Sequence, residues 1–417
     1  MWPLVTYSCQ HDDSYTALTM TSKLRIFDDI DRTDPSPAYD TEDSFHFLNR
    51  VAGIPWTKVR ELTDEWFADY PTRDQPDLRS RYREPGAAQH YGAAWELYVY
   101  TLYRRLGYDV RVHPTLPNTR RKPDFLVTRG DASTYVECVV HLSTGGSTTG
   151  PVAGERSWIF EATNQARNSN FMVDIEIRQT GAQRPKAVEI TRPLEDWLSS
   201  LHPGQVIEQI EAGSGSPKLV LHVRGWTIEY VAWPVNPDRR GEGGRLIGVY
   251  PSVGAFISNE MLQLRDLVKR KGAHYGLPDR PLAVAVLNTS GFAEDREVNE
   301  ALLGTEVAQH TPGQRDSVQV VRQRDGYWRQ GPPKRGARVS AVLVGHNIYP
   351  WRITADTPKL WINPWADNPM TDSPPLETYT ARNTGEVHQT RTASVTPAAI
   401  FSLDPGWPGF PLGTDTV

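Results

Sequence analysis

The chain has 417 residues, 38% of them hydrophobic, and a formal net charge of −5 at pH 7. This length and composition allow one large domain or two ordinary ones with an apolar core, and they exclude a disordered protein. The mild charge excludes a globally basic nucleic-acid binder, although a local basic patch is left open.

The cysteines and the N-terminus give information on the cellular compartment of the protein. Cys9 and Cys138 lie far apart and lack metal-ligand spacing, so neither a disulfide framework nor a zinc site is expected. The N-terminus has no basic region followed by a long apolar run, and no later segment approaches membrane-spanning length. We therefore expect a cytoplasmic protein without a membrane partner.

Residues 1–85 are expected to form an N-terminal extension, rich in Asp, Pro and Thr, with one helix at 56–70. The segment 86–106 has the hydrophobic spacing of an amphipathic helix, and Gly107 is its stop signal. A strand is expected in "YDVRVHP", and a hairpin follows in residues 120–142.

A Gly/Ser/Thr-rich loop at 143–154 follows the hairpin. Because it lacks the GxxxxGK[ST] pattern, it is expected to face a substrate rather than to hold nucleotide phosphates. The elements expected after it are a helix at 155–168, a strand at 170–181, a short helix at 194–201, two strands within 216–235, a helix at 254–276 and a strand at 280–288. This order predicts a mixed α/β sheet covered by helices.

Residues 86–305 are thus the expected core, and 306–417 form a C-terminal region packed on it, with a strand near "RVSAVLVGHN" and many Pro and Trp residues. A stacking platform for bases or sugars is one interpretation of the C-terminal tryptophans. Packing against the main domain is favoured, because so many large rings seldom stay exposed. The tryptophans concerned are Trp351, Trp361, Trp365 and Trp407.

The hairpin carries a carboxylate on each arm. If Gly130 and Asp131 are the central residues of a type II′ turn, Asp124 lies opposite Glu137. Opposed Cβ atoms are about 4.5–5.5 Å apart, and like charges at that distance destabilise a sheet. A hard divalent cation would remove this repulsion. A slip of one residue would instead send the carboxylates to opposite faces and leave an ordinary surface hairpin.

A helix with a glutamate, a strand that begins Pro-Asp and a strand with a glutamate together resemble the core of the PD-(D/E)XK nuclease superfamily, which includes restriction endonucleases and DNA-repair nucleases. The matching stretches are "AAWELYVYTLYRRLGYDV", "KPDFLV" and "YVECVV" within residues 86–142, and the later elements to residue 290 fit loosely. "KGAHYG" and "LWINPWADNP" are similar to parts of uncharacterised bacterial members. The resemblance implies a restriction-endonuclease-like fold, in which Asp124 and Glu137 bind Mg²⁺ or Mn²⁺ and Glu96 completes the metal site.

The superfamily's lysine is expected two residues beyond Glu137, where this chain has Val139. In the proposed register Lys122 lies across the strands from Val139 and is the first candidate to replace that lysine. Lys269 and Lys271, near the end of the later helix, come second. The structural alternatives are a flanking residue that neutralises phosphate for Lys122 and cation placement at a helix C-terminus for the other two.

Other polar residues are less specific. The basic residues 104–105 and 120–122 form either a rim for nucleic-acid phosphates or a solvated face. His113 and His141 flank the hairpin without a second histidine at metal spacing, so packing is expected for both. Cys138 should point away from Glu137 as an inert core thiol.

These features predict a metal-dependent nuclease that hydrolyses nucleic-acid phosphodiesters, with DNA the expected substrate. The resemblance alone implies a role in bacterial defence or DNA processing. The expected catalytic residues are Glu96, Asp124, Glu137 and Lys122. The alternative is a catalytically inactive nuclease-fold protein that binds nucleic acid or a partner, and a carbohydrate-binding protein has less support. A homodimer or a partner subunit is left open.

Overall fold

The computed structural model describes residues 23–409, except 37, 39–41, 118, 143–157, 161, 182, 213, 236, 238–239, 241–245, 248–256, 290–294, 310–318, 347, 355 and 383–386. The expected loop at 143–154 and Cys9 therefore lie outside the described residues. Among those described, no helix is long and apolar enough to cross a membrane.

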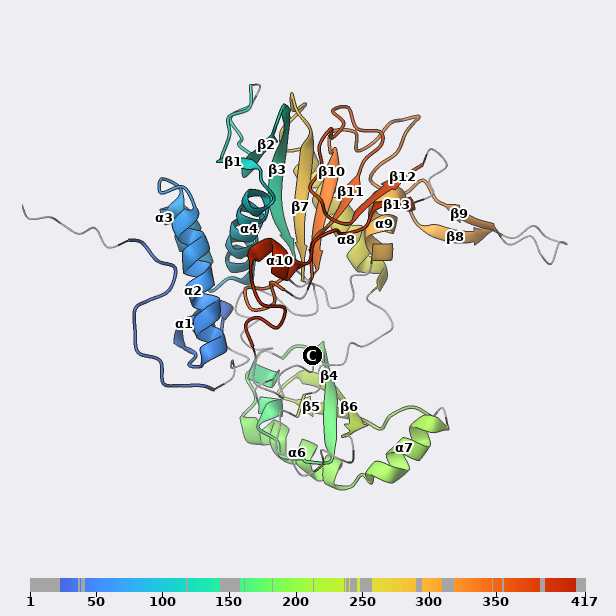
Figure 1. The fold of residues 1–417 in the computed structure, drawn as a ribbon. Coiled ribbons are helices and arrows are strands. Elements are labelled where there is room, and N and C mark those ends of the chain that lie inside the picture. The colour runs from blue at the N-terminus through green and yellow to red at the C-terminus, as the bar shows by residue number, and fades with distance from the viewer. Residues whose placement is uncertain are drawn as a thin grey trace, which may run out of the picture.

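An eight-stranded mixed sheet forms the centre of the molecule (Figure 1). Its strands, in spatial order, are β1 (Asp109–Val112), β2 (Phe125–Arg129), β3 (Ala132–His141), β7 (Leu282–Asn288), β10 (Ala341–His346), β11 (Lys359–Ile362), β12 (Thr378–Ala381) and β13 (Val387–Arg391). Strands β3, β7 and β10 are parallel neighbours, and β7 is buried along its whole length, as an apolar central strand of a parallel group should be.

Helices cover both faces of this sheet (Figure 1). The first face packs on α4 (Ala87–Arg105), which is joined by α1 (Ser44–Arg50), α2 (Ile54–Asp69), α3 (Gln75–Tyr82) and α10 (Pro397–Phe401). The second face packs on α8 (Ile257–Gly272) and α9 (Asp295–Leu303). Alternation along the strands produces this division: Val136 and Cys138 face α4, whereas Tyr135 and Val139 face α8. The predicted mixed α/β sheet flanked by helices is confirmed.

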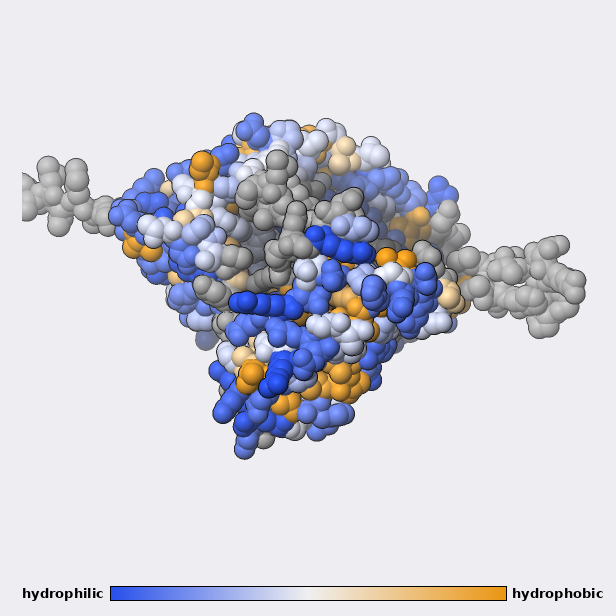
Figure 2. Space-filling model, turned by 90° about the horizontal axis from the view of Figure 1, so that it is seen from below, coloured by the Kyte–Doolittle hydropathy of each residue, from blue (hydrophilic) through white to orange (hydrophobic). Residues whose placement is uncertain are grey.

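A smaller unit lies below the main sheet in Figure 1. Its strands β4 (Phe171–Gln179), β6 (Trp226–Pro234) and β5 (Lys218–Val223) pack with α6 (Ala187–Ser199) and α7 (Pro203–Glu211) around a separate core. Hydrophilic residues cover most of the described surface on this side, with hydrophobic ones in small groups (Figure 2). A two-stranded ribbon, β8 (Glu306–Gln309) with β9 (Gln319–Arg322), completes the described strands.

The observed sheet changes the expected division of the chain. Strands β10 to β13 follow residue 305 but lie in the same sheet as β3, so the expected boundary at 305 falls within one structural unit. Helices α1 to α3 share a core with α4, so residues 44–82 are part of the main body rather than an extension. Residues 86–305 also contain the smaller unit with its own core.

The C-terminal tryptophans pack as expected. Trp361 is 1% exposed and stacks on Tyr379, and Trp351 stacks on Tyr349. Trp365 and Trp407 are partly buried against the two cores of the main sheet.

The hairpin has the expected turn and register. Gly130 has a φ of 58°, which a type II′ turn requires at its first central position. Arg129 pairs with Ala132 and Phe125 pairs with Val136. One residue further along, Asp124 lies at the level of Glu137.

Close packing of α4 on the sheet can be tested at Gly345 on β10. A Cβ atom there would lie 2.6 Å from the Trp95 ring, so Gly345→Ala should lower the free energy of unfolding by about 1–3 kcal/mol in urea titrations. The control is Gly92→Ala in the interior of α4, where a Cβ meets nothing within 4 Å and should be neutral or stabilising by up to about 1 kcal/mol. Equal stability of the two variants would contradict this packing.

Candidate active site

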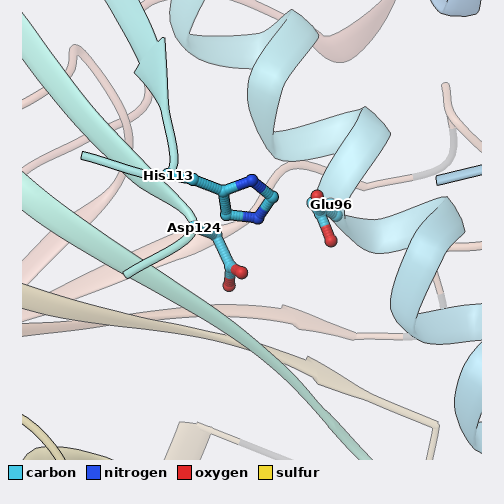
Figure 3. A group of neighbouring side chains, drawn as sticks. All are labelled: Glu96, His113 and Asp124. Atoms are coloured by element: carbon cyan, nitrogen blue, oxygen red, sulfur yellow. The ribbon is translucent and has the colours of Figure 1, made fainter. Parts of the chain in front are cut away.

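Three side chains converge where β1 and β2 approach α4 (Figure 3). Glu96 comes from α4, His113 directly follows β1, and Asp124 directly precedes β2. Because β1 and β2 are antiparallel with Val112 opposite Phe125, His113 and Asp124 are neighbours, and the His113 N–H donates to the Asp124 carbonyl at 2.9 Å. One potential ligand atom from each side chain lies within 4.8 Å of the other two.

The backbone at His113 is strained. Its φ is 47°, in the left-handed region, which costs a non-glycine residue about 1–3 kcal/mol. The imidazole ring lies between Asp124 and Glu96 (Figure 3). Strained residues of this kind cluster at functional sites.

Glu96 is 3% exposed and has both carboxylate oxygens bound by the N-terminal part of the chain. The Tyr70 hydroxyl donates to Oε1 at 2.7 Å, and the Arg81 guanidinium lies 2.8 Å from Oε2. Burial and the Glu96 charge raise the pKa of Tyr70, so its hydroxyl stays protonated as a donor. Arg81 therefore compensates the buried charge of Glu96.

Glu137 is 5% exposed and is bound from the other side of the sheet by α8 and the residues after it. Lys271 Nζ lies 2.7 Å from Oε1, and the Tyr275 hydroxyl donates to Oε2. Burial and Glu137 raise the pKa of Tyr275, which keeps this donor protonated. Val139 lies on the same face as Glu137, in the place where the superfamily pattern has a lysine.

Asp124 lies between these two compensated carboxylates. Its Oδ2 accepts the N–H of Cys138 at 2.6 Å, and no Lys or Arg forms an ion pair with it among the described residues. Burial, then the charges of Glu137 and Glu96, raise the pKa of Asp124 well above its ordinary value. Three carboxylates thus share two cationic partners, Arg81 and Lys271.

The structure corrects the prediction for Lys122. Strand β2 begins only at Phe125, because Pro123 has no N–H to donate to a ladder, so Lys122 is outside the pairing that would set it across from Val139. Its side chain is exposed, and its carbonyl accepts from the Tyr275 hydroxyl at 3.4 Å. The second-choice residue Lys271 is the lysine that contacts Glu137.

Of the other residues that the sequence suggested for the site, some lie at it and others lie around it. Lys269 lies in the wall of a separate groove. Arg105 pairs with Glu65 at 3.5 Å, whereas Arg121 donates to the carbonyl of His274 at 3.1 Å. Cys138 points away from Glu137, as expected, and faces α4, where burial raises the pKa of its thiol.

The expected set of metal ligands, Glu96, Asp124 and Glu137, changes by one residue. Among the described residues, the mutually close group contains Glu96 and Asp124 but has His113 in place of Glu137. Two carboxylates and an imidazole form a mixed oxygen and nitrogen set, which Mn²⁺ accepts more readily than Mg²⁺, an ion that prefers oxygen ligands. The residues present therefore fit a divalent cation.

Sequence reasoning missed Tyr70, Arg81 and Tyr275, and it assigned His113 to packing. A signal existed for His113, since antiparallel pairing places the residue after β1 beside the residue before β2. No local pattern marks Arg81 or Tyr275, because each meets its carboxylate only through tertiary packing.

Comparison of the chain with protein-family models, with curated proteins and with solved structures finds no match.

The raised pKa of Asp124 predicts how stability depends on pH without a divalent cation. An unfolded aspartate loses its proton at about pH 3.9, whereas folded Asp124 retains it to a higher pH. The folded state then binds more protons, so stability falls as pH rises between the two pKa values, by up to about 1.4 kcal/mol per pH unit. Asp124→Asn, which carries no charge, should therefore become increasingly more stable than wild type above about pH 4.

Urea titrations in chelator at several pH values measure this difference. Asp131→Asn, at the exposed hairpin turn, is the control and should show no such trend. A stability difference between Asp124→Asn and wild type that is constant with pH would contradict the charge assignment.

Proposed function

We propose that the protein is a divalent-cation-dependent phosphodiesterase that cuts nucleic acid, with the roles that the PD-(D/E)XK resemblance implies for its Pro-Asp and glutamate motifs. The observation that carries the proposal is the position of Asp124, a half-buried carboxylate between Glu96 and Glu137 without a cationic partner of its own among the described residues. Lys271, which binds Glu137, adds a cationic group that can stabilise negative charge on a phosphate. The restriction-endonuclease-like fold is part of the proposal, supported by α4 packing against the β2–β3 hairpin.

In this proposal Glu96, His113 and Asp124 hold the cation, which supplies polarisation of the phosphodiester and a water of lowered pKa. Arg81 and Tyr70 fix the orientation of Glu96. The Cys138 N–H fixes Oδ2 of Asp124, and the strained backbone of His113 sets its ring. A ligand set held in this way loses little entropy when it binds an ion.

Lys271 has the second role. Its ammonium group binds Glu137 on the α8 face of the hairpin, and its charge acts on Asp124. It comes from a different element than the superfamily's own lysine. There it would donate to the phosphate oxygens on which negative charge develops. Glu137 and Tyr275 are its positioning residues, since Glu137 holds the ammonium group and Tyr275 holds Glu137.

A second candidate function has a specific observation in its favour. Val139 replaces the motif lysine, and Lys271 is already engaged by Glu137. A protein that keeps the fold and binds nucleic acid without cutting it would show the same pattern.

Cleavage of supercoiled plasmid and of single-stranded DNA separates the two. Wild type should cleave with Mn²⁺ and with Mg²⁺ but not with chelator, and Asp124→Asn should lower the rate by at least about 100-fold because the cation loses a ligand. Asp131→Asn is again the control and should keep full activity. Cleavage by Asp124→Asn at the wild-type rate would overturn the site, and DNA binding without cleavage under any condition would favour the second function.

Lys271→Gln tests the relocated lysine. Loss of an electrostatic donor should lower the cleavage rate by about 10²–10³-fold with little change in the KM for DNA. Arg270→Gln, on the same turn and exposed, is the matched control. Thermal unfolding of both variants checks that the fold is kept, and an unchanged rate in folded Lys271→Gln would exclude the role.

A further inference from the structure

A basic groove of about 890 Å³ lies between α8 and residues 324–338, and the last turn of α8 separates it from the Lys271–Glu137 contact. Three of the side chains that line it are acidic, and six are cationic: Arg265, Lys269, Arg324, Lys334, Arg335 and Arg338. The whole chain carries a formal charge of −5, so this groove is a basic region on an acidic protein.

The three acidic side chains of the groove have partners within the protein, and Asp266 lies 3.8 Å from Arg265. Asp325 accepts both the N–H and the hydroxyl of Thr305, at 2.8 and 2.7 Å. Asp367 pairs with Lys334 at 2.6 Å. With six cationic and three acidic side chains, the groove keeps a formal net charge of +3.

Several of the cationic groups are available to a ligand. Lys269, Arg335 and Arg338 are exposed, and in the part of the chain that the structure describes they form no ion pair. Among the described residues, Arg324 donates only to the backbone carbonyl of Gly331. A polyanion would supply the charge that these side chains lack.

The loop that carries these arginines is held rigidly. The N–H groups of Tyr327 and Trp328 donate to the carbonyls of Ala301 and Leu302 at 3.0 and 2.7 Å, which ties the loop to the end of α9. Asn363 donates to the carbonyl of Gly336 at 3.2 Å, and the Trp328 side chain is 2% exposed. A fixed frame lowers the entropic cost of binding an extended ligand.

We propose that this groove binds the phosphodiester backbone of the nucleic-acid strand whose scissile phosphate lies at Asp124. The identity of the ligand as nucleic acid rests on the proposed function, whereas its polyanionic chemistry rests on the groove. Lys269 and Gly272 form part of the groove wall, and Lys271, on the same turn of α8, reaches Glu137. The groove and the Lys271–Glu137 contact therefore flank one turn of α8, and a helix with its side chains is about 10–12 Å across, a span that three or four nucleotides cover at about 3.4 Å per charge.

Fluorescence anisotropy of a labelled single-stranded oligodeoxynucleotide of about 20 nucleotides tests this site on the full chain. The titrations are made in chelator, so that they do not depend on catalysis. The double variant Lys269→Gln/Arg338→Gln should weaken binding by at least about fivefold at low salt, and it should make the slope of log K against log [salt] shallower by about 2.

The matched control is Arg167→Gln/Arg192→Gln, which removes two exposed arginines from the smaller unit and should leave both quantities unchanged. An unchanged affinity in the groove variant, or an equal loss in the control, would overturn the inference. Displacement of the oligonucleotide by equimolar ATP would also overturn it, because the groove would then recognise a free nucleotide. If wild type cleaves no DNA but the groove variant alone loses binding, the proposed function fails and the groove assignment stands.

Discussion

Repulsion among three carboxylates is the constraint on which the centre of this protein depends. Asp124 lies between Glu96 and Glu137, both almost fully buried, and such a group is unstable unless cations balance it. The fold supplies two of them from segments far apart in the chain. Arg81 comes from α3 and reaches Glu96 on one face of the sheet, and Lys271 comes from α8 and reaches Glu137 on the other.

This charge balance explains why the N-terminal helices and α8 belong to one body with the hairpin. Loss of Arg81 or Lys271 would leave a buried carboxylate without compensation, which is more costly than loss of an exposed ion pair. The imbalance that remains is centred on Asp124. All the protein groups of the site are in place, and it still carries excess negative charge. Such a site is suited to a divalent cation, and a phosphate can bind through that cation.

Local geometry made part of this site predictable from the sequence. The turn at Gly130 fixes the hairpin register, and that register put Asp124 beside Glu137. The helix with Glu96 followed from its hydrophobic spacing. Lys122 does not take its expected place because Pro123 has no N–H for a ladder, so β2 begins only at Phe125.

The rest depended on contacts that no local pattern records. Lys271 and Glu137 are 134 residues apart, and β7 and β10, which join the two halves of the sheet, pair across a predicted domain boundary. The basic groove was equally hidden, because its charges come from α8 and from a loop about 60 residues later, within a chain of negative net charge.

An anomalous-difference map from crystals soaked in Mn²⁺ tests the central claim most directly. The charge balance predicts a peak in contact with Glu96, His113 and Asp124, and no peak at this position in crystals of Asp124→Asn. A wild-type map without a peak there, or with its main peak away from Asp124, would contradict the account.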